Sequence, residues 1–239
     1  MPITYDSQKR IFKLDTKTST YALLVYRENY LVHLYYGAKL PDDNLASLMY
    51  RGRFDSLSPY NPKVEDELFS PDINPLEYST NGAGDFRISA CSVRGENGDT
   101  VTDLRYVSHR ILPGKPKLPG LPATFAGEDE AQTLELETVD SVTGVRAFLL
   151  YTVFEEYGVI TRSVRFENRG SAPVVLERAY SACVDFPGMD FDMVHLYGRW
   201  AKENSTARHP LQHGIQSIQS KRGMTCLLYT SPSPRDRQK

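Results

Sequence analysis

Short runs of alternating apolar and polar residues fill most of the chain, and glycine, proline, asparagine and aspartate separate them. A period of two is typical of β-strands that have one buried and one solvated face. Near the N-terminus this pattern predicts strands at residues 11–14, 21–27 and 30–36, the last two joined by a tight turn at Glu28 and Asn29. The chain therefore begins as an antiparallel sheet.

A short helix and a long loop are expected to follow these strands. Asp42 or Asp43 is placed to cap a helix that carries Leu45, Leu48 and Met49 at three- and four-residue spacing. Between residues 51 and 84 the alternation gives way to proline, serine, asparagine and aspartate. A loop of this length in a compact domain usually serves a function.

The middle of the chain predicts a hairpin and then a meander of four strands. Residues 86–93 and 101–111 alternate on either side of Asn97-Gly98, a pair that adopts the positive φ angles of a tight hairpin turn. The meander consists of strands starting at residue 133 and covering 145–154, 159–168 and 174–184. Residues 145–154 are apolar on both faces, so this strand is expected to lie centrally.

Composition restricts the class of protein. The 239 residues carry 28 basic and 30 acidic side chains, a net charge of −2, which gives no concentrated positive field for nucleic acid or an anionic membrane. No apolar run approaches the roughly 18–20 residues of a membrane helix, and the N-terminus lacks the apolar segment of a signal peptide. Three widely spaced cysteines argue against a disulfide framework, and Cys91 and Cys183 are expected to be reduced core residues. We therefore expect an all-β, cytoplasmic protein folded as a large two-sheet antiparallel β-sandwich.

Candidate chemistry is sparse. The sequence has no nucleophile elbow, no complete phosphate-binding glycine motif and no paired metal ligands, so no catalytic residue, metal or cofactor is assigned. Residues 185–200 interleave three carboxylates with aromatic side chains and the single tryptophan, Trp200, a composition that suits sugar binding. Strand-end caps and a packed tryptophan explain the same residues without function.

Two loops offer further candidates. Arg51, Arg53 and Asp55 provide guanidinium and carboxylate groups that suit sugar hydroxyls, although on these residues alone a solvated loop is the favoured explanation. Residues 112–124 contain four prolines, and we interpret this segment as a rigid connector between sheets, with a binding loop as the alternative.

Three long strings resemble a known family. They are VTDLRYVSHRILPGKPKLPGLPAT at residues 101–124, GVITRSVRFENRG at 158–170 and VDFPGMDFDMVHLYGRW at 184–200. Together they resemble the N-terminal domain of bacterial α-galactosidases of glycoside hydrolase family 36, over residues 3–224. The resemblance implies a large β-sandwich (supersandwich) that precedes a (β/α)8 barrel, and retaining hydrolysis of terminal α-1,6-linked galactose, as in melibiose and raffinose.

The resemblance also implies what this chain lacks. The family's aspartate nucleophile follows a lysine-aromatic-aspartate motif in the barrel, and neither Lys-Trp-Asp nor Lys-Tyr-Asp occurs here. In tetrameric relatives the loop after the first strands reaches a neighbouring subunit's active site. The resemblance therefore implies a homo-oligomer that binds galactoside oligosaccharides, with Arg53 and Asp55 as substrate contacts in trans and Trp200 as a further contact.

The end of the chain departs from the family. Residues 226–239 include Ser-Pro-Ser-Pro and a charged terminus, and they resemble adapter-derived translations at the ends of unrelated reading frames; a disordered terminus is the other interpretation. We expect residues 1–225 to form a sandwich domain that is incomplete at its C-terminal end, and residues 226–239 to be a non-native or disordered tail. A non-catalytic fragment of an α-galactosidase is the leading hypothesis; a stand-alone carbohydrate-binding module and a purely structural interaction domain are the alternatives.

Overall fold

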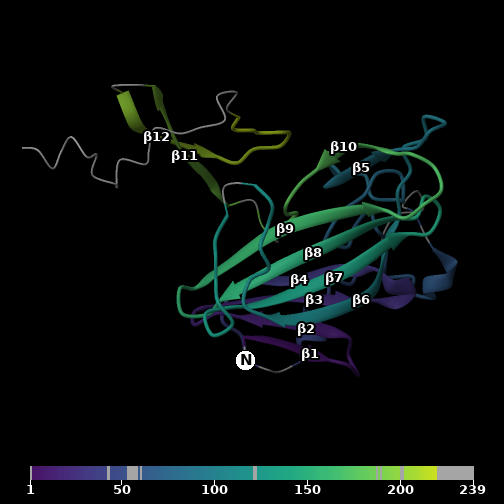
Figure 1. Cartoon of the computed structure of the whole chain (residues 1–239), viewed down its shortest axis with the longest axis horizontal. Helices are drawn as coiled ribbons and strands as arrows, with labels where there is room; N and C mark the ends of the chain where they lie inside the picture. Colours follow the sequence, from purple (N-terminus) through teal and green to yellow (C-terminus); the bar gives the residue numbers. More distant parts are fainter. Residues whose placement is uncertain are drawn as a thin grey trace, which may run out of the picture. The chain divides into compact units, whose positions relative to one another are not determined.

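The structure, a computed structural model, confirms an all-β architecture made of antiparallel sheets (Figure 1). It describes residues 2–41, 44–52, 59, 61–120, 123–186, 188, 190–199 and 202–219, with the side chains of residues 202 and 203 excepted. These residues contain strands and three short 3-10 helices and no α-helix. The chain divides into two compact units, Met1–Asp185 and Phe186–Lys239, which we describe separately.

The first sheet of the larger unit contains four sequential strands. They are β1 (Ile3–Asp6), β2 (Ile11–Asp15), β3 (Ser19–Val25) and β4 (Leu31–Ala38). The predicted tight turn is confirmed, because Glu28 and Asn29 in the 3-10 turn η1 (Arg27–Asn29) both have positive φ angles, 55° and 59°. Two positive φ angles match the twist of the flanking strands in a two-residue hairpin. β1 was not expected from the alternation.

The second sheet is also a meander. It consists of β6 (Leu104–Pro113), β7 (Gln132–Asp140), β8 (Val145–Phe154) and β9 (Val159–Asn168), in that order. The central position predicted for residues 145–154 is confirmed, since β8 lies between β7 and β9 and nine of its ten residues are buried. Phe148 of β8 faces away from the core between the sheets, and the guanidinium of Arg165 lies over its ring, 3.9 Å from the centroid.

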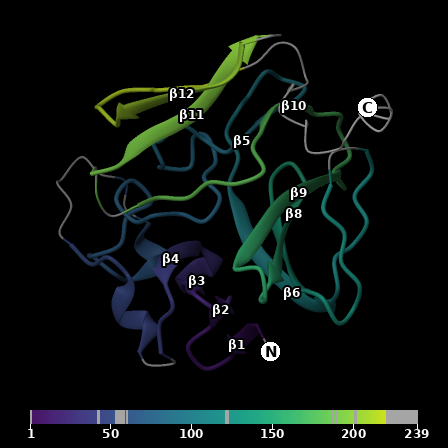
Figure 2. The same cartoon turned by 90° about the vertical axis from the view of Figure 1, so that its left-hand side faces the viewer.

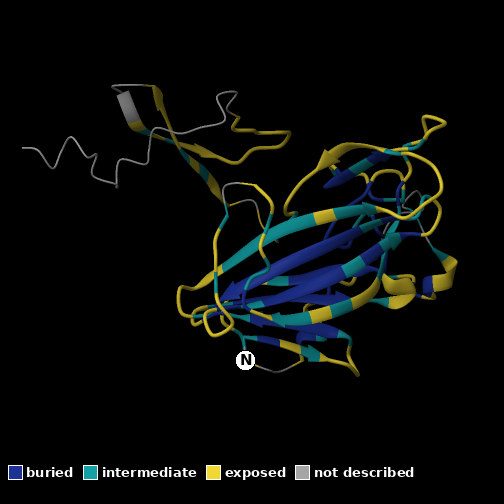
Figure 3. Ribbon diagram, in the orientation of Figure 1, coloured by how far each residue is buried: buried dark blue, intermediate teal, exposed yellow. Residues whose placement is uncertain are grey.

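The core lies between these two sheets, which form separate layers in Figure 2. Phe12, Leu14 and Leu23 of the first sheet pack in one cluster with Leu136 and Leu149 of the second, all fully buried. Figure 3 shows this buried interior as dark blue along β7 and β8. Burial of so many large apolar side chains between two sheets is what stabilises a sandwich, and the predicted two-sheet fold is thereby confirmed.

A second cluster covers the other face of the first sheet. Ala22 and Leu24 of β3 and Val32 of β4 contact residues of the long loop, including Val64 and Phe69. The loop that follows β4 is therefore packed onto the sheet. It contains the predicted short helix as η2 (Leu45–Leu48), a 3-10 helix that follows Asn44 without a capping hydrogen bond from that side chain, and then η3 (Pro62–Val64). Asp42 and Asp43, the predicted caps, lie outside the described residues.

The predicted hairpin of residues 86–111 is wrong. Its turn forms, because the Gly95 and Asp99 backbones are hydrogen-bonded at 2.9 Å and Gly98 has φ 85°. The flanking strands, however, do not pair with each other: β5 (Cys91–Arg94) pairs with β10 (Val175–Ala179), and β6 pairs with β7. The fourth strand of the predicted meander is thus also misplaced, since β10 joins β5 and not β9.

A close contact between two turns explains why β10 leaves the meander. After β9, the N–H of Arg169 donates to the carbonyl of Gly144, and a Cβ at Gly170 would lie 2.0 Å from the Thr143 carbonyl oxygen. The side chain of Asn168 accepts from Gly170 and donates to Ala172. These bonds hold the chain against the β7–β8 turn and direct it away from the edge of β9.

Two further expectations are settled by the same unit. The interpretation of residues 112–124 as a connector between sheets is wrong, because β6 and β7 are antiparallel neighbours in one sheet. Cys91 and Cys183 are both free; Cys91 is buried, as expected, whereas Cys183 is only partly so. Burial raises the pKa of the Cys91 thiol to about 12, so this cysteine is an inert core residue.

The smaller unit contains one described hairpin, β11 (Asp192–Arg199) and β12 (Lys202–Pro210). The predicted domain boundary at residue 225 and the tail 226–239 lie outside the described residues and stay predictions. Throughout the described part of the chain, no helix has the length and apolar character that crossing a bilayer requires.

Candidate functional site

The long loop after β4 has two stems, residues 50–52 and residue 59, which lie on either side of residues 53–58. Ionic and polar contacts hold the first stem. Arg51 donates from Nη2 to both carboxylate oxygens of Asp66, at 3.1 and 2.8 Å, and the hydroxyl of Tyr26 also donates to Asp66. Burial acts to raise the pKa of Asp66, but the hydrogen bonds from Tyr26 and Leu68 and the charge of Arg51 lower it overall. Asp66 is therefore a charged anchor that joins β3 to this stem.

Two short polar side chains hold the neighbouring backbone. Asn74 donates from Nδ2 to the carbonyl of Tyr50 at 2.8 Å, and the hydroxyl of Ser70 donates to the carbonyl of Pro59 at 2.9 Å. Both Ser70 and Asn74 are fully buried. Carbonyls on either side of residues 53–58 are thus fixed by side chains from one turn, as expected for a loop that serves a precise purpose.

The predicted substrate contacts lie outside the described residues. Arg53 and Asp55 belong to the segment between the two stems, and Trp200 follows β11; none of the three is described, and their roles stay predictions. The structure shows how the flanking residues are anchored. This anchoring was not predictable from the sequence, because Asp66, Ser70 and Asn74 lie in a stretch without periodicity.

Arg87 connects three segments of the same region. Its Nε and Nη2 donate to the two carboxylate oxygens of Asp85, both at 2.9 Å, and Nη1 donates to Asp185. Nη2 also donates to the backbone carbonyls of Pro71 and Asn74. Asp85 is nearly completely buried, with 2% of its side chain exposed. This bidentate pair therefore locks residues 71–74, 85–87 and 185 together.

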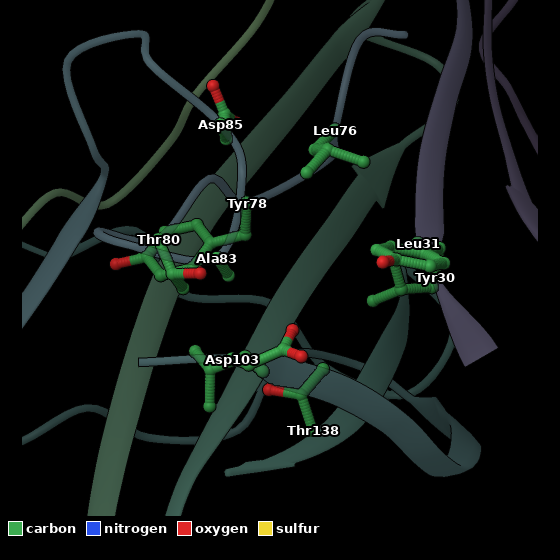
Figure 4. Close-up of a pocket in the computed structure, with 10 residues that line it drawn as sticks. Tyr30, Leu31, Leu76, Tyr78, Thr80, Ala83, Asp85, Asp103 and Thr138 are labelled. Atoms are coloured by element: carbon green, nitrogen blue, oxygen red, sulfur yellow. The ribbon is translucent and has the colours of Figure 1, made fainter. Parts of the chain in front are cut away.

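A small cavity opens beside this ion pair (Figure 4). It encloses about 20 Å³, room for about one water molecule, whereas ligand sites are typically about 300–1,000 Å³. Tyr30, Tyr78, Asp85 and Asp103 contribute to its wall. Both carboxylates are occupied, Asp85 by Arg87 and Asp103 by Arg105, whose Nε and Nη2 lie 2.6 and 2.7 Å from it. This cavity has neither the volume for a sugar ring nor a free carboxylate pair.

A second polar cluster lies buried between the sheets. The hydroxyls of Tyr21 and Tyr151 both donate to Oε1 of Glu77 at 2.6 Å, and Nη1 of Arg162 lies 3.1 Å from the same oxygen. Nδ1 of His33 lies 3.2 Å from Oε2. The side chain of Glu77 is completely buried. Burial acts to raise its pKa, but Arg162, His33 and Tyr151 hold that pKa below the usual value.

This cluster connects the two sheets. Glu77 lies in the connection between β4 and β5, and its four partners come from β3, β4, β8 and β9. The guanidinium of Arg162 lies over the ring of Tyr151, 4.0 Å from its centroid. Sequence reasoning missed Glu77. A signal for Arg162 existed, because it shares the alternation phase of the apolar residues Ile160 and Val164.

Two of the three carboxylates of residues 185–200 are engaged in ion pairs, each within its own unit. Asp185 accepts from Arg87 in the larger unit, and Asp192 accepts from Arg208 across the β11–β12 hairpin. The rings of Phe186 and Phe191 lie 5.2 Å apart. Asp185 and Asp192 are thus held by arginine side chains, and the predicted roles of this segment in capping or in sugar binding stay predictions. Across the described residues, no group of three or more His, Cys, Asp or Glu side chains is arranged to hold a metal ion.

Comparison with known proteins connects this architecture to carbohydrate hydrolysis. α-Galactosidase AgaA of Geobacillus stearothermophilus is 43% identical over 224 residues, which make up 93% of this chain and 30% of that protein. The bifunctional α-galactosidase/sucrose kinase AgaSK of Mediterraneibacter gnavus is 42% identical over 229 residues, 96% of this chain and 24% of that protein. The chain thus spans about 30% or less of the length of these relatives.

Solved structures agree with the sequence matches. The crystal structure of α-galactosidase AgaB from Geobacillus stearothermophilus superposes with a TM-score of 0.85 at 43% identity, covering 93% of this chain and 30% of that one. An AgaA variant in complex with raffinose gives a TM-score of 0.82 at 44% identity, covering 89% and 30%. The sequence profile of the glycosyl hydrolase family 36 N-terminal domain matches residues 29–228. The chain is therefore a member of the N-terminal domain family of family 36 glycosyl hydrolases.

Proposed function

We propose that this chain is the N-terminal, non-catalytic part of a retaining α-galactosidase. The observation that carries the proposal is the coverage: almost the whole chain matches family 36 enzymes, yet it accounts for about 30% of their length. A stand-alone carbohydrate-binding module is not favoured, because the two relatives described above are α-galactosidases of which this chain covers 30% and 24%. The cavity beside Asp85 is also too small for a sugar.

The role of the domain follows from what its described residues are able to do. Retaining hydrolysis needs two carboxyl groups about 5–5.5 Å apart, one acting as nucleophile and the other as acid and base. Asp85, Asp103, Asp185 and Glu77 are each paired with an arginine. Their side chains are therefore unsuited to that chemistry, and the proposed contribution is to wall the active site and support assembly.

Arg53 and Asp55 are the proposed direct contacts with a galactoside, supplied to a neighbouring subunit of a homotetramer, and Trp200 is a further contact. The anchors at Arg51, Asp66, Ser70 and Asn74 support this proposal, since they fix the backbone on both sides of residues 53–58. A cytoplasmic location belongs to the same proposal and is supported by the free thiols of Cys91 and Cys183.

The purified chain is expected to release no galactose from raffinose or an aryl α-galactoside, because Asp85, Asp103, Asp185 and Glu77 are each held in an ion pair with arginine. The natural reading frame, cloned with its downstream sequence, is expected to encode an enzyme that hydrolyses both substrates. Galactose release is measured with a coupled dehydrogenase assay, and calorimetric titration with galactose tests the binding-module alternative. Hydrolysis by the chain alone, or a downstream sequence without a catalytic domain, would contradict the proposal.

Asp55→Ala in that full-length enzyme is expected to raise KM for raffinose about tenfold, since a hydrogen bond between a charged group and a ligand contributes about 1.5 kcal/mol or more. The matched control is Glu156→Ala, which removes a carboxylate that is 70% exposed on the β8–β9 turn. Steady-state kinetics with raffinose and an aryl galactoside distinguish the two variants. Unchanged kinetics for Asp55→Ala on both substrates would remove this residue from the site.

A further inference from the structure

A long connection joins the end of β6 to the start of β7. The two strands are antiparallel neighbours, and Pro113 is paired with Gln132 at the end of the ladder. The connection between them takes residues 114–131, although about two to five residues suffice for a hairpin, and we call its described residues, 114–120 and 123–131, the arm. Figures 1 and 3 show the arm as a loop that leaves the end of β6 and returns to the start of β7, with much of it exposed.

The base of the arm is closed by specific hydrogen bonds. The N–H of Gly114 donates to the carbonyl of Ala131 at 2.8 Å, and the N–H of Lys115 donates to the carbonyl of Ala126 at 3.3 Å. The hydroxyl of Thr133 donates to the carbonyl of Gly114 at 2.7 Å. Gly114 has φ +66°, and a Cβ there would lie 2.9 Å from the carbonyl oxygen of Gly127, so the position requires glycine.

The exposed part of the arm is stiff and carries an apolar group. Pro116 and Pro119 fix two φ angles of the outgoing limb, and the side chain of Glu130 accepts from the N–H of Gly127 on the return limb. Phe125 is 71% exposed. A preorganised segment that presents an aromatic side chain to solvent loses little entropy on binding, which is typical of interaction surfaces.

Opposite charges on the arm do not neutralise one another. Lys115 and Lys117 lie on the outgoing limb, whereas Glu128 and Asp129 lie at the turn of the return limb. No salt bridge within 4 Å joins these four side chains among the described residues, although an exposed pair such as Lys17 and Glu156 does form one elsewhere. The arm thus carries matched basic and acidic groups that remain available to a partner.

We propose that the arm is a self-complementary docking surface for a second copy of this chain. In a two-fold contact, Phe125 of each copy packs against the other arm, and Lys115 and Lys117 of one copy face Glu128 and Asp129 of its partner. The symmetry forms every ion pair twice. The proposal rests on the homo-oligomer that we propose above and assigns one of its contact surfaces.

Sedimentation velocity over a concentration series tests the arm directly. The chain is expected to form a reversible dimer that weakens as ionic strength rises. Phe125→Ser is expected to raise the dimer dissociation constant about tenfold or more, because a central aromatic residue carries much of the binding energy of such a contact. Val142→Ser is the matched control, since Val142 is 89% exposed on the β7–β8 turn, outside the arm.

Charge exchange makes the test specific for two copies. The variant Lys115→Glu with Lys117→Glu and the variant Glu128→Lys with Asp129→Lys are each expected to be monomeric, because in each variant the four docking side chains at positions 115, 117, 128 and 129 carry a single sign of charge. An equimolar mixture of the two is expected to form a heterodimer. Circular dichroism and melting temperatures equal to those of the parent show that each variant is folded.

Several results would overturn the proposal. The first is a parent chain that is monomeric at every concentration. The second is association that the arm variants leave unchanged, for example association through the outer edge of β9. The third is a mixture of the charge variants that stays monomeric. Each of these leaves the proposed α-galactosidase function intact, since that function is tested by galactose release and by the downstream sequence.

Discussion

Replacing Glu77 with alanine is expected to lower the free energy of unfolding by about 3–5 kcal/mol, the usual cost of removing one partner of a buried ion pair. The carboxylate is completely buried and accepts hydrogen bonds from Tyr21 and Tyr151 at 2.6 Å. Without it, Arg162 remains as a charge that is nine-tenths buried and has no acid to neutralise it. His33 also loses its partner.

Equilibrium urea denaturation measures this loss as a fall in the midpoint concentration. Glu156→Ala is the control: it breaks the ion pair with Lys17, in which 57% and 70% of the two side chains are exposed, and is expected to leave the urea midpoint nearly unchanged. Equal costs for the two substitutions would show that the buried cluster contributes no more than a surface pair. Glu77→Gln, which keeps an acceptor but not the charge, separates the effect of lost hydrogen bonds from that of the unpaired buried charge of Arg162.

The same residue gives a pH dependence with a defined sign. The pKa of Glu77 lies below its usual value of 4.5 in the folded protein, so the carboxylate binds protons less readily there than in the unfolded chain. Its contribution to stability is therefore fully present above about pH 4.5 and is lost as pH falls through the folded-state pKa. The difference in unfolding free energy between the parent and Glu77→Gln is expected to shrink over that acidic range.

Local patterns allowed the individual strands to be predicted. The alternation in residues 11–36 and 133–168 defined β2–β4 and β7–β9, because each of these strands is joined to its neighbour by a short turn whose residues are visible in the sequence. Glu28 and Asn29 form such a turn. Where the connection is short, the neighbour in sequence is also the neighbour in the sheet.

Pairing between distant strands was beyond the same reasoning. Asn97-Gly98 formed the expected turn, yet Ala179 faces Cys91 across the β5–β10 ladder, a partner far away in sequence. An alternation with a period of two predicts which residues of a strand are buried, but it does not predict which strand lies beside them. The cluster around Glu77 was missed for a related reason, since its five side chains come together only after the two sheets have packed.

The candidate site was also predicted only in part, since the sequence indicated its loop but not the contacts that hold it. The sequence singled out the loop of residues 51–84 by its composition, and its interest is supported by the anchoring of both stems by Asp66, Ser70 and Asn74. The role of Arg87 was not predicted, because it stands at a polar position of an expected strand, where an arginine is ordinarily solvated. Its five hydrogen-bond acceptors lie in segments up to 98 residues away in sequence.

Arg87→Ala is expected to cost about 2–3 kcal/mol and to loosen the loop region in particular. The substitution leaves the buried carboxylate of Asp85 without its bidentate partner and removes donors from the carbonyls of Pro71 and Asn74. Asn74 in turn holds the carbonyl of Tyr50. Faster amide hydrogen exchange is therefore expected across residues 70–87, with little change in β7 and β8, whose cores are formed by other contacts.

Arg94→Ala provides the matched control, because Arg94 lies close by in sequence on β5 and pairs with Glu177, in which 44% and 40% of the side chains are exposed. Its loss is expected to cost less than about 1 kcal/mol and to leave exchange in residues 70–87 unchanged. A double variant of Arg87→Ala with Asp85→Asn is expected to be more stable than the sum of the single effects predicts, since the buried charge is then removed together with its partner. Strict additivity, or exchange that accelerates uniformly over the sandwich, would contradict the view that Arg87 acts locally through Asp85, and would instead make it a general contributor to the stability of the domain.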